Sequence, residues 1–105
     1  MEIIQWYHYV AAFFAGLFLV NGIPHFFQGV SGNGFPTPFS NPRGIGLSAP
    51  FINVVWASFN FAIGFILFRA SHVCTGQTGL VVALLGGMLL MSLFVSIHFT
   101  KKHKE

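Results

Sequence analysis

Three long apolar segments without a charged side chain constrain the fold of this chain more than any other feature. They run from residue 3 to 23, from 51 to 68 and from 79 to 99. Each approaches or reaches the ~20 apolar residues that an α-helix needs to cross the ~30 Å hydrocarbon core of a bilayer. A charge at the centre of such a helix costs about 2.5–3.5 kcal/mol, and these segments avoid that cost. We therefore expect transmembrane helices over residues 3–23, 51–69 and 79–99.

The composition agrees with this interpretation. Only 7% of the residues are charged, whereas 54% are hydrophobic. A soluble domain carries about 25% charged residues, and a chain of 105 residues encloses too little interior to bury so much apolar surface. The lone cysteine, Cys74, excludes a disulfide-rich scaffold. The sequence predicts an all-α membrane protein with a single membrane domain over residues 1–105, in contact with the lipid bilayer.

The few basic residues set the expected orientation. Lys and Arg are in excess on the cytoplasmic side of membrane proteins. The loop over 24–50 contains Arg43 and the basic tail over 100–105 contains three lysines, whereas the other side, with the short loop over 70–78, holds only Arg69. We expect the N-terminus outside and the C-terminus in the cytoplasm. The positive charge is confined mainly to the tail, so nucleic acid is not an expected partner.

The loop over 24–50 is rich in glycine and proline, yet it also carries phenylalanines. Pro24 is expected to end the first helix within about a turn. Exposed phenylalanine is costly and proline limits the freedom of the chain, which favours a loop folded against the membrane surface or the helix ends over a mobile one. We expect Phe35 and Phe39 to dip into the membrane interface. With Arg43 as its one fixed charge, the loop is then a docking element.

Three short runs of sequence are distinctive. They are Asn21-Gly22-Ile23-Pro24-His25-Phe26, Phe35-Pro36-Thr37-Pro38-Phe39-Ser40 and Asn53-Val54-Val55-Trp56. Together these runs resemble a family of short bacterial integral membrane proteins that has no assigned activity. The resemblance covers roughly residues 20–64. It implies a multi-pass protein of the bacterial inner (cytoplasmic) membrane and supplies no catalytic residues.

The strongest polar pattern lies in the second predicted helix. Asn53, Ala57, Asn60 and Gly64 share one narrow helix face. Small residues let helices approach closely, and amides hydrogen-bond across the contact. A helix–helix seam is therefore the favoured interpretation, and a polar lining for a solute path is the alternative. The same two interpretations apply to three further residues of the other helices, which are His8, Asn21 and Gly87.

Two histidines, His25 and His98, are expected at similar depth on the cytoplasmic side. Histidine titrates near neutral pH. Three interpretations stay open for this pair: interfacial histidines satisfied by their neighbours, a metal or haem site, and a cluster that handles protons or solutes. A tight zinc site uses three or four protein ligands, and no cysteine or carboxylate is expected at this depth. We therefore predict no metal and no cofactor.

Catalytic chemistry has little support in the sequence. The chain has no aspartate, and its two glutamates are Glu2 and Glu105, which excludes a carboxylate acid–base pair within the bundle. We expect a non-catalytic accessory subunit, or a homo-oligomer, that packs through its small-residue and asparagine faces. The partner is then another membrane protein or a second copy. The alternatives are a transporter or channel subunit and a redox protein that binds haem or metal.

Overall fold

The computed structural model describes residues 3–101, which form three α-helices: α1 (Trp6–Val30), α2 (Pro50–Ala70) and α3 (Thr78–His98). Two short 3₁₀-helices, η1 (Val73–Thr75) and η2 (Phe99–Lys101), follow α2 and α3. No strand forms among the described residues. All three α-helices are long and apolar enough to cross a membrane. The predicted all-α fold with three such helices is confirmed. The basic tail lies outside the described residues from Lys102 onward.

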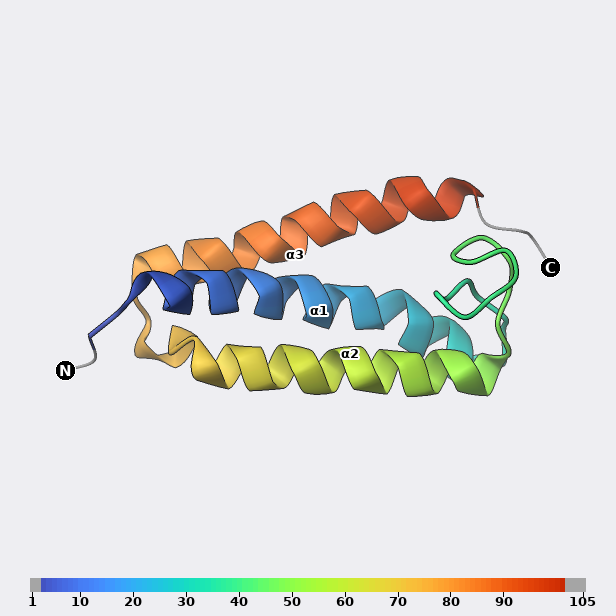
Figure 1. The fold of residues 1–105 in the computed structure, drawn as a ribbon, viewed down its shortest axis with the longest axis horizontal. Helices are drawn as coiled ribbons and strands as arrows, with labels where there is room; N and C mark the ends of the chain where they lie inside the picture. The colour runs from blue at the N-terminus through green and yellow to red at the C-terminus, as the bar shows by residue number, and fades with distance from the viewer. Residues whose placement is uncertain (1–2, 102–105) are drawn as a thin grey trace.

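Helix α1 lies between the other two helices (Figure 1). It packs against α2 on one side and α3 on the other, whereas α2 and α3 hardly contact each other. The molecule is elongated, with principal dimensions of 51, 23 and 19 Å. This length exceeds the ~40–45 Å of a bilayer with its headgroups. Because both other helices pack on α1, it is the element on which they assemble.

Helix α1 begins at Trp6 and ends at Val30, so the expected helix over residues 3–23 is corrected at both ends. Pro24 lies inside the helix, although proline removes a backbone hydrogen bond. Contacts with α2 hold the turns after it. A Cβ built on Gly29 would lie 2.8 Å from the carbonyl oxygen of Pro50 in α2, which shows how closely the two backbones approach. Tertiary packing thus overrides the local proline signal, and the loop runs over 31–49 only.

Glycines permit the close contacts on both sides of α1. A Cβ built on Gly87 of α3 would overlap the carbonyl oxygen of Phe13 in α1. On the other side, a Cβ built on Gly64 of α2 would lie 2.7 Å from Leu19 Cγ in α1. A bulky side chain therefore sits directly on Gly64, and a backbone group sits on Gly87. Both glycines are used in packing within the chain.

The contact between α1 and α3 predicts different effects for two adjacent glycines. Gly87→Ala is expected to destabilise the protein, because the new methyl group overlaps the α1 backbone, and overpacking typically costs about 1–3 kcal/mol. Gly86→Ala is the matched control, since a Cβ there meets no atom within 4 Å. Both changes raise helix propensity equally. Thermal unfolding in detergent, followed by circular dichroism, compares them, and equal melting temperatures would contradict the contact.

Candidate functional site

The loop over 31–49 folds back over the end of the bundle where α1 ends, α2 begins and α3 ends (Figure 1). Phe35 and Ser48 form an isolated antiparallel bridge, in which each backbone N–H donates to the other residue's carbonyl oxygen. The hydroxyls of Thr37 and Ser48 lie 2.6 Å apart. The Thr37 carbonyl accepts from the Ser40 hydroxyl at 2.7 Å and from the Gly44 N–H at 2.9 Å. The loop is thus an ordered structure with its own hydrogen bonds.

Asn53, fully buried near the start of α2, joins this loop to the helices. Its amide nitrogen donates to the carbonyl oxygens of Phe35 at 2.9 Å and Ser48 at 3.3 Å. Its amide oxygen lies 2.9 Å from Nδ1 of His25 on α1. Because the amide oxygen can only accept, Nδ1 of His25 carries the proton. In the neutral imidazole, Nε2 of His25 then has a lone pair to offer.

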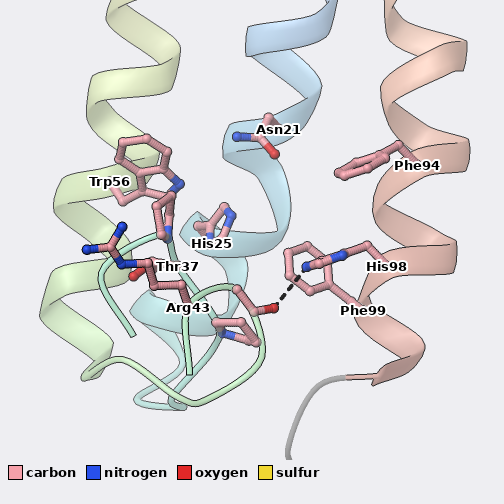
Figure 2. A pocket seen from close by; sticks show the side chains of 11 residues that line it. Asn21, His25, Thr37, Arg43, Trp56, Phe94, His98 and Phe99 are labelled. Atoms are coloured by element: carbon pink, nitrogen blue, oxygen red, sulfur yellow. Dashed lines mark hydrogen bonds between the residues drawn. The ribbon is translucent and has the colours of Figure 1, made fainter. Parts of the chain in front are cut away.

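A pocket of about 350 Å³ lies between the loop and the helices (Figure 2). All three helices, η2 and the loop contribute to its lining, which is mostly aromatic and proline side chains with a few polar groups. The lining residues are Asn21, His25, Pro36, Thr37, Pro38, Arg43, Gly44, Trp56, Phe94, His98 and Phe99. Pockets of ~300–1,000 Å³ with few polar groups are typical of small-molecule sites. We take this pocket as the candidate functional site.

The structure brings His25 and His98 to the same pocket, as their expected depth suggested. Nε2 of His98 donates to the carbonyl oxygen of Gly44 at 2.9 Å (Figure 2). The ring of Phe99 contacts both, with centroids 5.8 Å from His25 and 5.1 Å from His98. Each histidine thus has one ring nitrogen bonded within the chain. Across residues 3–101, no group of three or more His, Cys, Asp or Glu side chains is placed to hold a metal ion.

Of the other predicted polar residues, Asn21 also lines this pocket, whereas His8 and Asn60 are not part of its lining. His8 is at the opposite end, where its Nδ1 accepts from the backbone N–H of Gln5 at 2.8 Å and caps α1. Asn21 donates to Asn60 at 2.9 Å, and Asn60 donates to the carbonyl oxygen of Trp56 at 2.8 Å. Asn21 and Asn60 thus link α1 to α2, whereas His8 bonds at the N-terminus of α1, far from them. The face of Asn53, Asn60 and Gly64 is buried.

The three loop residues proposed for docking have different positions. Phe35 is only 5% exposed, and its ring packs on His25 and Phe99. The expectation that it dips into the membrane interface was wrong, because its bridge to Ser48 holds it beneath the loop. Phe39 is 69% exposed and lies edge-on against Trp56. Arg43 is exposed at the rim of the pocket.

Sequence reasoning did not single out Trp56 as a site residue. The available signal was its type and place: tryptophan near a helix end combines a large apolar ring with an N–H that needs a partner. Phe94 and Phe99 gave no signal that separates them from the other phenylalanines of the chain.

No protein-family model matches this chain, and no curated protein or solved structure shows significant similarity to it. The resemblance of the three sequence runs to short bacterial membrane proteins therefore stays a prediction.

The bonds of Asn53 lead to a prediction about the loop. Asn53→Leu is expected to loosen the loop, because His25 loses its side-chain partner and the carbonyl oxygens of Phe35 and Ser48 keep only their bonds within the loop. A buried polar group that is left without a partner costs about 1–3 kcal/mol. Hydrogen exchange should then accelerate at the loop amides of Phe35, Gly44 and Ser48, while the centre of α3 stays protected.

The control for this experiment is Ser58→Ala, since that exposed hydroxyl bonds only to the carbonyl oxygen of Val54 in its own helix. Exchange in the loop should be unchanged in this variant. Equal loop protection in Asn53→Leu and wild-type protein would show that Asn53 does not anchor the loop.

Proposed function

We propose that this protein is a non-catalytic accessory subunit of a membrane-protein assembly, and that it binds its partner through α3. The observation that carries the proposal is the one-sided packing of this helix. Helix α3 is the most apolar of the three candidate spans, yet it buries only Leu80 and Gly87 within the chain. It therefore offers more unpaired apolar surface than α1 or α2.

Gly86 is the point on α3 where a partner helix can approach most closely. It is exposed near the middle of the helix, and a Cβ there would meet no atom of this chain within 4 Å. Its neighbours Leu85, Leu89 and Leu90 are more than half exposed. A small residue among large apolar ones is the usual setting for tight helix contacts in membranes.

The packing within the chain moves the proposed partner surface away from the faces that the sequence suggested. An accessory subunit or a homo-oligomer was expected to pack through the small-residue and asparagine faces. Gly64 and Gly87, the key residues of those faces, are covered by Leu19 and by the α1 backbone. Neither a different protein nor a second copy has access to them, which leaves the exposed side of α3 as the proposed surface. The non-catalytic role rests on the sequence, whose only carboxylate side chains are Glu2 and Glu105.

Gly86→Leu tests the proposed partner surface. Native mass spectrometry of wild-type protein, extracted from host membranes in mild detergent, is expected to show a second, different polypeptide. Gly86→Leu should lose it, because the new side chain keeps a partner helix away. The melting temperature should stay close to that of Gly86→Ala, since the added atoms enter open space.

The matched control is Ala62→Leu, which enlarges an exposed small residue of α2 and should retain the partner. A bare wild-type monomer would overturn the proposal, and a wild-type homo-oligomer would replace the accessory role with self-association.

We further propose that the protein resides in a bacterial inner membrane with its N-terminus outside and its C-terminus in the cytoplasm. Arg43 lies in the loop at one end of the bundle, the end at which α3 leads into η2 and Lys101, whereas Arg69 closes α2 at the other end. This separation supports the orientation expected from the positive-inside rule.

Cys74 provides a test of this orientation. It is the single cysteine of the chain and lies exposed in η1, between α2 and α3. A membrane-impermeant maleimide is expected to label it from the outer face of intact spheroplasts. Cys74→Ser should remain unlabelled, which controls for other reactions. Labelling only in inverted vesicles would place Cys74 on the cytoplasmic side and would contradict the proposed orientation.

A further inference from the structure

We propose that the pocket at the loop end binds the acidic headgroup of an anionic phospholipid, with one acyl chain in an adjoining groove beside Trp56. This inference is independent of the accessory role, because it concerns the pocket at the loop end and not the apolar face of α3.

The charge of the pocket selects an anion. Among the described residues that line it, Arg43 is the only one with a formal charge. Residues 3–101 contain no Asp or Glu, so no carboxylate of the described chain neutralises it. Arginine forms paired, charge-assisted hydrogen bonds with phosphate oxygens. A basic residue near a bilayer surface is also attracted to anionic lipids.

The unused hydrogen-bonding atoms fit a phosphodiester headgroup with hydroxyls. Within the described part of the chain, the guanidinium of Arg43 and the indole N–H of Trp56 have no hydrogen-bond partner, so two donors from different elements are available. In Figure 2, Arg43 extends from the loop on the same side of the pocket as Trp56. Nε2 of His25 is an acceptor, because Nδ1 donates to Asn53. Phosphate oxygens suit the donors, and a headgroup hydroxyl suits His25.

The shape indicates an amphiphile and not a soluble anion. Trp56 lines a second depression of about 250 Å³, whose other walls are Phe39, Ile52, Val55 and Phe59. This groove lies on the exposed, apolar side of α2, where Val55 and Phe59 are more than half exposed. The Trp56 ring thus lies between the pocket that contains Arg43 and His25 and a groove with apolar walls. One lipid molecule can place its headgroup in the first and an acyl chain in the second.

Trp56 itself is the reporter for the test. The chain has two tryptophans, and Trp6 lies at the far end of α1, so a Trp6→Phe variant isolates the signal of Trp56. The full-length protein is placed in nanodiscs of unlabelled phosphatidylcholine that contain increasing fractions of a lipid with brominated acyl chains. This lipid is either phosphatidylglycerol or phosphatidylcholine, and the quenching of Trp56 fluorescence is measured. Phosphatidylglycerol is expected to reach half-maximal quenching at a several-fold lower fraction.

Substitutions at Arg43 test whether its charge causes the preference for phosphatidylglycerol. Arg43→Gln is expected to make the two lipids quench equally, while Arg43→Lys keeps part of the difference because it keeps the charge. The matched control is Arg69→Gln at the opposite end of α2, which should leave the preference intact. Hydrogen exchange of the loop amides confirms that each variant stays folded.

Competition separates the two sources of a phosphate group. Unbrominated phosphatidylglycerol should reverse the quenching, whereas glycerol 3-phosphate in solution should not. If glycerol 3-phosphate reversed the quenching, the pocket would be a site for soluble anions and the proposed lipid ligand would be wrong. Equal quenching by both lipids in the Trp6→Phe protein, or a preference that survives Arg43→Gln, would overturn the proposal. None of these outcomes depends on whether a protein partner binds α3.

Discussion

The side chain of Asn53 bonds both to the loop and to α1, and the structure of the loop end of the molecule depends on this group of bonds. Its amide nitrogen meets the carbonyl oxygens of Phe35 and Ser48, and its amide oxygen meets His25. The two carbonyl oxygens also accept from each other's residue in the bridge, so Asn53 adds bonds from α2 to a loop that is already paired. An unpaired imidazole away from water would cost several kcal/mol. One amide therefore ties the loop to α2, fixes the tautomer of His25 and holds that ring in the wall of the pocket.

The central position of α1 explains why this pocket exists. Helices α2 and α3 both pack on α1 and hardly contact each other, so a space opens between them. The loop lies in that space at one end (Figure 1). There the rings of Phe35 and Phe99 are 4.6 Å apart between centroids. His98 then bonds to Gly44 and connects the end of α3 to the loop. The same arrangement leaves most of α3 without a neighbour among residues 3–101.

Sequence reasoning predicted the features that depend on transfer into lipid and missed those that depend on long-range packing. The charge-free apolar segments predicted the first and last residues of α2 and α3 to within one residue. Pro24 misled the prediction for α1, because the contact of Gly29 with α2 has no local signature. The shared depth of His25 and His98 followed from the order of the helices. Their bonding partners, Asn53 and Gly44, depend on helix rotation and loop folding, which depth does not determine.

Phe35 shows the same limit inside the loop. Hydrophobicity predicts that such a ring will be covered, but it does not distinguish membrane from protein as the cover. The backbone bridge to Ser48, thirteen residues further along the chain, holds Phe35 beneath the loop, so its ring is covered by protein. Phe39 lacks such a bridge and stays 69% exposed. Two phenylalanines of similar sequence context therefore have different roles, one in the base of the loop and one beside the apolar groove.

The scarcity of charge also limits how Arg43 can be neutralised. A basic residue at a membrane surface either stays in water, pairs with a carboxylate of its own chain, or pairs with an anion from outside. The described chain supplies no carboxylate, and Arg43 lines a pocket that also contains the indole of Trp56. Solvation alone accounts for an exposed arginine, but it does not account for a second unpaired donor, the indole N–H of Trp56, in the same pocket. Two unpaired donors in one concave site complement an acceptor that carries negative charge, and the nearest abundant source of such acceptors is the bilayer in which the helices lie.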